Sequence, residues 1–247
     1  MKRWSIWLIL LILLLPVCAL AEEDLRNYDL TRTFTGGTLA SGHYTMVDDV
    51  TLTDSWHVIT ESDLGGLVIV QNQIELDLNG HELKVTGEAR ILIDGGIMTV
   101  TDSKGDGRVI GELQPNQDRT GDYLFVVSNS YDETGKRLAS GVLKTKFGGS
   151  SYLKSDLGLL YIDNPEDVSN GPSVSFSGGR YVADLSAENL ESFSGGLVVN
   201  HRGTMNLSDD AELSLSLGSF QYAYIDNLGQ LTADDAALLA GLINRAE

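Results

Sequence analysis

Short apolar stretches recur along this chain, separated by clusters of Gly, Asn, Asp and Ser. Within most of them apolar and polar residues alternate, as in residues 74–78 and 97–101. Alternation with period two between turn residues is the pattern of β-strands, whereas amphipathic helices repeat about every 3.6 residues. No convincing helical period occurs before residue 230, so the sequence predicts an all-β protein.

Many of these predicted strands end on Asn, Asp or Gly. Tyr-Ile-Asp-Asn occurs at residues 161–164 and again at 224–227. A unit that recurs every ~20–35 residues is typical of a stacked solenoid. Asn tolerates the left-handed conformation of a tight corner, and stacked asparagines exchange side-chain hydrogen bonds. Insertions such as Tyr131–Ser140 and Pro165–Gly171 are expected to project on one side of the stack.

One run of motifs resembles a known family. Asp77-Leu78-Asn79-Gly80-His81, the strand from Gly95 to Val100, Thr101-Asp102-Ser103 and Gly105-Asp106-Gly107 follow one another in the order seen in right-handed parallel β-helix proteins of bacterial surfaces, in the wider pectin-lyase-like group. The close resemblance covers residues 37–113, and from 122 to 239 only the strand-and-corner rhythm continues. The resemblance implies a β-helix solenoid but no particular activity.

The predicted organisation has one β-helix domain, residues 37–247, preceded by a cover segment at 22–36. An open solenoid exposes its last turn to further pairing. Residues 232–246 predict an amphipathic helix that caps this turn, because Thr232 suits the N-cap and Leu238, Leu239, Leu242 and Ile243 share one helical face. The competing interpretation continues the strands through Leu238–Ile243.

Residues 1–21 have the three parts of a secretory signal peptide. Lys2 and Arg3 precede an apolar stretch, and Ala19-Leu20-Ala21 forms the cleavage site. An uncleaved anchor and a lipoprotein modified at Cys18 are weaker alternatives. The sequence therefore predicts a secreted or cell-surface bacterial protein, with no membrane-spanning segment after cleavage.

The charge and the cysteine content restrict the partners and the means of stabilisation. The chain has a formal charge of −18, which becomes −20 when Lys2 and Arg3 leave with the signal peptide. Such a charge argues against nucleic acid as a partner. The single cysteine, Cys18, leaves with the same segment, so the domain must rely on a packed core instead of disulfides.

Asn79-Gly80-His81 is the first candidate for chemistry. Asn-Gly between two alternating strands is a strong turn signal. His81 lacks a cysteine partner, and His43, His57 and His201 lack metal-ligand spacing. The motif therefore predicts a corner instead of a catalytic histidine.

Two stretches partly resemble calcium loops. In residues 102–113, Asp102 and Asp106 suit ligand positions, but Lys104 and Leu113 occupy positions that need oxygen. Residues 226–236 resemble half of a dockerin. With Gly229 at loop position six, however, Tyr224 and Leu228 fall at positions one and five, which require oxygen ligands. We therefore expect no metal site or cofactor, although calcium at Asp102 and Asp106 stays an open question.

Catalysis on polysaccharides is the main enzymatic alternative. Asp209-Asp210 near His201 invite comparison with glycosidases, but adjacent aspartates share a face only on a turn. A lyase needs a base beside the uronate, and the basic residues lie singly along the chain: Lys144, Lys146, Lys154, Arg180 and Arg202. No catalytic residue is assigned from the sequence, and a non-catalytic protein is favoured.

Aromatic residues concentrate in the second half of the chain. The set is Tyr123, Phe125, Phe147, Tyr152, Tyr161, Phe176, Tyr181, Phe220, Tyr222 and Tyr224. They favour stacking in the interior over an outer sugar-binding strip. The sequence thus predicts an exported, surface-structural or binding protein, adhesin-like and in contact with glycans. The alternatives are a polysaccharide lyase or hydrolase, and a piece of a longer adhesin.

Overall fold

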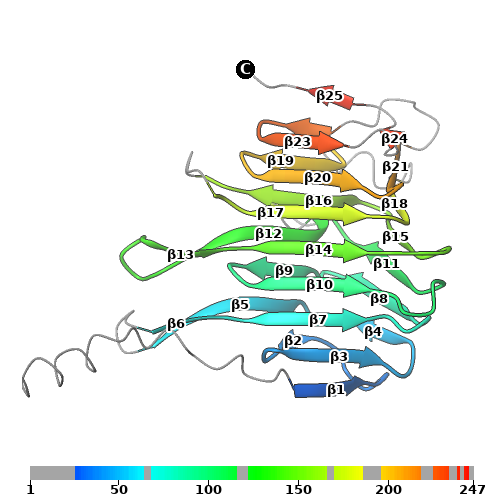
Figure 1. Ribbon diagram of the computed structural model, residues 1–247, viewed down its shortest axis with the longest axis horizontal. Coiled ribbons are helices and arrows are strands. Elements are labelled where there is room, and N and C mark those ends of the chain that lie inside the picture. The colour runs from blue at the N-terminus through cyan, green and yellow to red at the C-terminus, as the bar shows by residue number, and fades with distance from the viewer. Residues whose placement is uncertain are drawn as a thin grey trace, which may run out of the picture.

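A computed structural model describes residues 26–63, 68–115, 122–165, 170–185, 196–217, 225–233, 238–239 and 242–244. These residues form β-strands and connections, with no α-helix among them, and the strands build three sheets. Parallel pairing holds throughout the three sheets, apart from two antiparallel hairpins (Figure 1). The all-β prediction is confirmed.

The candidate functional site lies on the eight-stranded sheet. The strands of this sheet, in order, are β1 (Arg26–Leu30), β3 (Gly42–Met46), β7 (Gln73–Asp77), β10 (Ile97–Thr101), β14 (Val142–Lys146), β17 (Ser173–Ser177), β20 (Thr204–Ser208) and β23 (Gln230–Ala233). Each strand pairs in register with those before and after it, so Thr99 lies between Glu75 and Lys144.

The other two sheets follow the same rule. The seven-stranded sheet contains β4 (Val50–Leu52), β8 (Glu82–Gly87), β11 (Arg108–Leu113), β15 (Tyr152–Ser155), β18 (Arg180–Leu185), β21 (Glu212–Leu217) and β24 (Leu238–Leu239). The ten-stranded sheet contains β2 (Gly37–Thr38), β5 (Trp56–Asp63), β9 (Ile91–Asp94), β12 (Tyr123–Tyr131), β16 (Gly158–Asp163), β19 (Val198–His201), β22 (Ile225–Asn227) and β25 (Leu242–Asn244), with β6 (Val68–Gln71) and β13 (Arg137–Ser140) as hairpin partners.

The chain passes through the sheets in rotation. β7, β8 and β9 lie in the eight-, seven- and ten-stranded sheets respectively, and β10, β11 and β12 repeat this order one layer further on. Each strand therefore hydrogen-bonds to its equivalents in the neighbouring layers, about 4.8 Å away. This arrangement of parallel strands and repeated units is compatible with a parallel β-helix.

Alternate residues of each strand point into the stack and form the core. Along the eight-stranded sheet Ile74, Met98, Leu143, Val174 and Met205 are aligned by the register and are at most 1% exposed. Burying an aliphatic side chain of this size contributes about 2 kcal/mol. The period-two pattern of the sequence thus specifies which face of each strand is internal.

Aromatic rings also stack inside. Phe176 and Tyr181 lie nearly parallel with centroids 4.1 Å apart, and Phe147 is also stacked with Tyr181, with centroids 5.8 Å apart. The Tyr181 hydroxyl is hydrogen-bonded to the buried hydroxyl of Thr145. The interior placement expected for the aromatic residues holds for these rings, whereas Phe220, Tyr222 and Tyr224 lie outside the described residues.

Buried asparagines line the corner from the ten-stranded to the eight-stranded sheet. Asn129 Nδ2 donates to Asn164 Oδ1 over 2.9 Å, and Asn200 Nδ2 donates to Asn227 Oδ1 over 2.7 Å. All four side chains are at most 4% exposed. The predicted exchange of hydrogen bonds between corner asparagines is confirmed for these two pairs.

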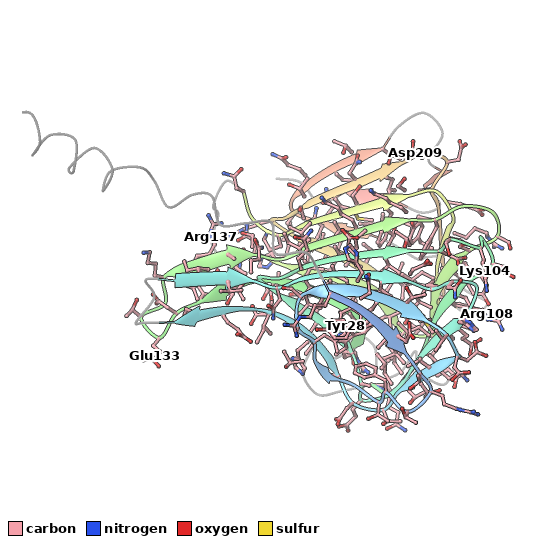
Figure 2. The ribbon with its side chains drawn as sticks, turned by 60° about the horizontal axis from the view of Figure 1, so that its bottom comes forward. Tyr28, Lys104, Arg108, Glu133, Arg137 and Asp209 are labelled. Carbon is pink, nitrogen blue, oxygen red and sulfur yellow. The ribbon has the colours of Figure 1, made fainter. Side chains whose placement is uncertain are left out.

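The same corner carries the projecting segments. The hairpins β5–β6 and β12–β13 leave the stack there (Figure 1), and Figure 2 shows Glu133 and Arg137 on the side opposite Lys104 and Arg108. Ser140 Oγ donates to the Asn170 carbonyl over 2.9 Å. The insertion at Tyr131–Ser140 and the described end of the next insertion therefore lie together, as expected.

The predicted capping helix over residues 232–246 is wrong. Leu238–Leu239 and Leu242–Asn244 form β24 and β25, which pair in parallel with β21 and β22. Strands at the open end of a sheet offer unpaired backbone groups, and a following segment satisfies them by adding a further layer. The chain follows the competing interpretation, in which the strands continue.

In the segments that the structure describes, no helix is long and apolar enough to cross a membrane. The predicted signal peptide at residues 1–21 lies outside these segments, as does the start of the predicted cover at 22–36. From Arg26 onward that cover contains β1, which pairs with β3 and places Tyr28 on Tyr44 with ring centroids 4.8 Å apart.

Candidate functional site

The outer face of the eight-stranded sheet is mostly polar, and its partly exposed apolar residues include Ile97 and Val142, which are paired in register. Because side chains alternate across a strand, the residues between the core positions form columns that run from layer to layer. One column contains Asn27, His43, Glu75, Thr99, Lys144, Ser175, Asn206 and Thr232, and the next contains Asp29, Thr45, Asp77, Thr101, Lys146, Ser177 and Ser208. Beyond β14, towards the C-terminal layers, one column continues with Ser175, Asn206 and Thr232 and the other with Ser177 and Ser208, so hydroxyl groups predominate there.

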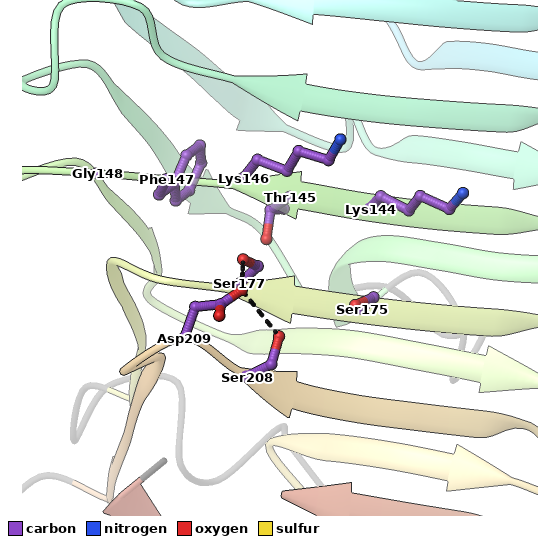
Figure 3. A pocket seen from close by; sticks show the side chains of 9 residues that line it. All are labelled: Lys144, Thr145, Lys146, Phe147, Gly148, Ser175, Ser177, Ser208 and Asp209. Carbon is purple, nitrogen blue, oxygen red and sulfur yellow. Dashed lines mark hydrogen bonds between the residues drawn. The ribbon is translucent and has the colours of Figure 1, made fainter. Parts of the chain in front are cut away.

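An open hollow of about 500 Å³ lies on this face over β14, β17 and β20 (Figure 3). It is lined by Lys144, Thr145, Lys146, Phe147, Gly148, Ser175, Ser177, Ser208 and Asp209. The lining therefore combines two cations, several hydroxyl groups and one carboxylate. Such a surface can hydrogen-bond an oxygen-rich ligand as both donor and acceptor.

Asp209 forms one rim of the hollow. Its Oδ2 accepts a hydrogen bond from Ser177 Oγ over 2.7 Å and a longer one from Ser208 Oγ over 3.4 Å. Asp209 and Asp210 both have positive φ, at 54° and 62°, so they form a tight corner after β20. Asp tolerates this left-handed conformation better than most residues do, and here the corner directs one carboxylate over the serines.

Lys144 and Lys146 form the opposite rim and lie on alternate positions of β14. Their α-carbons are about 7 Å apart, and both side chains extend in the same direction (Figure 3). Their register neighbours are Thr99 and Ser175 for Lys144, and Thr101 and Ser177 for Lys146. Within the described residues, neither ammonium group has a carboxylate within 4.0 Å.

On the outer face of the seven-stranded sheet, basic residues are paired with acidic ones. Among the described residues, four ion pairs on this face each join neighbouring layers: Arg108 to Glu82 at 2.7 Å, Lys84 to Glu112 at 2.7 Å, Lys154 to Asp184 at 3.4 Å and Arg180 to Glu212 at 3.5 Å. Here the register brings each cation beside an acid. The lysines at the hollow therefore stand out in an acidic protein because their register neighbours are hydroxyl groups.

Asn79-Gly80-His81 is a corner, as predicted. Asn79 and Gly80 have φ values of 49° and 79°, and Asn79 Nδ2 donates to the Met46 carbonyl of the preceding layer over 2.9 Å. His81 Nδ1 lies 3.4 Å from Asp49 Oδ1, at the surface. These contacts explain the motif by turn geometry and interlayer hydrogen bonding.

The carboxylate of Asp102 is occupied by hydrogen bonds. Its Oδ1 accepts from the amides of Gly80 and Lys104, at 2.8 and 3.3 Å, and its Oδ2 accepts from the Gly107 amide and Ser151 Oγ, at 2.5 and 2.7 Å. In the described residues no group of three or more His, Cys, Asp or Glu side chains is placed to hold a metal ion. Asp102 thus organises the corner that the sequence compared with a calcium loop.

The dockerin-like stretch has a structural explanation in its described part. Asn227 ends β22 and belongs to the asparagine corner. A side chain at Gly229 would place its β-carbon 2.3 Å from the Gly203 carbonyl oxygen, so close packing between layers requires glycine there. Asp234 and Asp235 lie outside the described residues.

The other candidates from the sequence separate in space. Asp209 lines the hollow, whereas His201 lies on the outer face of the ten-stranded sheet with Nδ1 3.5 Å from Asp163 Oδ1. Lys154 and Arg180 belong to the ion pairs of the seven-stranded sheet, and Arg202 Nη1 donates to the Pro165 carbonyl. Only Lys144 and Lys146 among these basic residues join Asp209 at the hollow.

A second polar column was missed by sequence reasoning. On the outer face of the ten-stranded sheet the register aligns Asp94, Ser128, Asp163 and His201 in successive layers. Ser128 Oγ donates to Asp94 Oδ1 over 3.3 Å. Each of these residues lies at or near the end of its strand. A recurring acidic or polar residue at strand ends is therefore the sequence signal that could have revealed this column.

No protein-family model, no curated protein and no solved structure matches this chain.

Proposed function

We propose that this protein is a non-catalytic, exported right-handed parallel β-helix that holds an extended glycan along the outer face of its eight-stranded sheet. Secretion or display at the cell surface is part of the proposal and depends on the predicted signal peptide. A right-handed course agrees with the general preference of parallel crossover connections. The proposal also includes an adhesin-like role and a relation to the pectin-lyase-like group.

The observation that carries the proposal is the hydroxyl-rich outer face with its open hollow. Ser175, Ser177 and Ser208 line the hollow, and Asn206 and Thr232 continue the polar column beside it. Sugars present closely spaced hydroxyl groups, which need partners that both donate and accept. The flat face and the regular spacing of about 4.8 Å between layers suit a polymer better than a compact ligand.

The lining of the hollow favours binding over hydrolysis. A glycosidase uses two carboxyl groups with a defined separation. Asp209 is the one carboxylate among the lining residues, and it already accepts hydrogen bonds from two serines. This arrangement positions polar groups for recognition without providing an acid and base pair.

A second candidate function is favoured by the column on the ten-stranded sheet. Asp94 and Asp163 project from the same face two layers apart, which corresponds to about 10 Å between their backbones. Inverting glycosidases hold their carboxyl groups at about 6.5–9.5 Å. Hydrolysis of a polysaccharide at this column is therefore the enzymatic alternative.

The test is retention and product release with residues 22–247 on a panel of plant, microbial and host polysaccharides, with and without calcium. We expect retention of at least one polymer and no released oligosaccharides. Asn206→Ala together with Ser175→Ala should weaken retention about fivefold, because each lost hydrogen bond contributes about 1 kcal/mol at most at an exposed site.

The matched control is Ser214→Ala on the outer face of the seven-stranded sheet, which should retain the polymer as the parent protein does. Oligosaccharides released by the parent but not by Asp94→Asn or Asp163→Asn would establish the enzymatic alternative. A panel on which no polymer is retained would refute the binding proposal.

A further inference from the structure

Two positive charges at the hollow lack a partner within the described protein, although the chain is strongly acidic. Lys144 and Lys146 are exposed, and the register surrounds them with Thr99, Thr101 and the serines of β17. On the seven-stranded sheet, by contrast, each of four cations faces an acid in the adjacent layer. The same repeated architecture thus pairs its cations on one face and leaves them available on another.

We propose that Lys144 and Lys146 form an anion subsite, which takes a sulfate, phosphate or carboxylate group of the bound polymer. This inference rests on the proposed glycan-binding function and specifies the chemical class of the ligand. The two lysines stand on alternate positions of one strand, with α-carbons about 7 Å apart. Their like charges repel each other, and an anion placed between or above them removes this repulsion. Ser175, which lines the hollow beside Lys144, supplies a neutral donor to the same anion.

The hollow is polarised, and this polarity orients the ligand. The carboxylate of Asp209 lies over Ser177 and Ser208, on the opposite side from the lysine ammonium groups (Figure 3). A negative group is attracted to the lysine rim and repelled from the Asp209 rim. The ligand therefore places its anionic group over β14 and its neutral hydroxyl groups over Asp209, which accepts hydrogen bonds from them.

The subsite is tested first with inorganic sulfate, independently of any polymer. Sodium sulfate replaces sodium chloride at constant ionic strength while the amide resonances of the protein are recorded. We expect saturable shifts at Lys144, Thr145, Lys146 and Ser175, and their loss in the double variant K144Q/K146Q. Shifts that do not saturate, or that persist in the double variant, would overturn the subsite.

The ligand class is then tested with matched polymers: dextran against dextran sulfate, and methyl-esterified against free polyuronate. We expect the parent protein to prefer the charged member of each pair of polymers. K144Q/K146Q should lose about tenfold in affinity for that polymer, because an exposed ion pair contributes at most about 1 kcal/mol and two such pairs are removed. Its binding should also become less sensitive to salt, because screening weakens exposed charge pairs.

The control variant K84Q/K154Q removes the same charge from the seven-stranded sheet and should bind as the parent protein does. Equal retention of charged and neutral polymers by the parent and K144Q/K146Q would overturn the inference and uphold glycan binding. Saturable sulfate binding at the lysines without retention of any polymer would uphold the subsite and refute the glycan proposal.

Discussion

At the residue scale, Asp102 shows how one carboxylate organises a corner. Burial alone would raise its pKa, but hydrogen bonds from the Ser151 hydroxyl and from the amides of Gly107, Gly80 and Lys104 outweigh burial and lower the pKa below its ordinary value of 3.8. A group with a lowered folded-state pKa stabilises the fold above its unfolded-state pKa. This stabilisation disappears as the pH falls through the folded-state value.

Asp102→Asn should therefore lower the free energy of unfolding by about 2 kcal/mol at neutral pH, because the amide nitrogen cannot accept the hydrogen bonds that one carboxylate oxygen accepts now. The difference from the parent should be largest above about pH 4 and shrink in more acidic solution. Urea denaturation at several pH values measures it. Asp106→Asn, in the same turn but exposed, is the control and should change little.

Calcium should not stabilise this corner. Both oxygens of Asp102 already accept hydrogen bonds from the protein, so a cation would have to displace four donors. Thermal melting with millimolar calcium and with a chelator should give the same Tm. A calcium-dependent rise in Tm that Asp102→Asn removes would contradict this expectation.

Asp209 allows a second test of the polarity of the hollow. Asp209→Asn keeps a residue that tolerates the positive φ of this corner, and it removes the negative charge at one rim. Retention of dextran sulfate should rise about twofold, within the range of exposed charge interactions. Asp210→Asn has the same charge change and a similar φ but does not line the hollow, so it should have less effect.

At the scale of elements, the corner asparagines connect neighbouring layers. The Asn200 side chain donates to Asn227 and to the Gln230 carbonyl, and its Oδ1 accepts from the Gly203 amide over 2.9 Å. Its side chain is fully buried. A corner of this kind thus satisfies backbone groups that a turn between parallel strands would leave unpaired.

Asn200→Ala should reduce the free energy of unfolding by about 3 kcal/mol, because two buried hydrogen bonds and one partly buried hydrogen bond are lost together. Asn206→Ala is the control. Its amide accepts a single exposed hydrogen bond from Thr232 Oγ1, so its loss should cost less than about 1 kcal/mol. Equal losses in denaturant titrations would show that burial at the corner has no special role.

The elements that the sequence predicted correctly are those specified locally. Alternation identified the strands, and Asn79-Gly80 identified a corner from its own two residues. The helix expected at 232–246 failed because Leu238, Leu239, Leu242 and Ile243 fit a helical face and two short strands equally well. The open edges of β21 and β22, which lie outside the segment itself, decide between the two.

The hollow was beyond prediction for a related reason. Alternation places Lys144 and Lys146 on one face of a strand, and this much is readable from residues 142–146. Whether the next layer offers an acid or a hydroxyl depends on the register between β14 and β17, which are joined through two other strands and irregular connections. The neighbours of Lys144 and Lys146 in the adjacent layers therefore could not be read from the sequence alone.

At the scale of the whole molecule, stability should be graded along the stack. Each layer contacts only its neighbours, so the central layers have support on both sides and the end layers on one. Amide hydrogens of β10, β14 and β17 should exchange most slowly, and those of β1 and β23 faster. Hydrogen exchange measured by mass spectrometry would show this gradient, and uniform protection would contradict it.

The parallel register also determines how the protein responds to tension. Hydrogen bonds between layers run along the stack and are loaded one after another when the molecule is stretched in that direction. Force along the strands would instead load many bonds at once in shear. A bound polymer that pulls across the layers should therefore peel them apart singly at low force, whereas one that pulls along the strands meets high mechanical resistance.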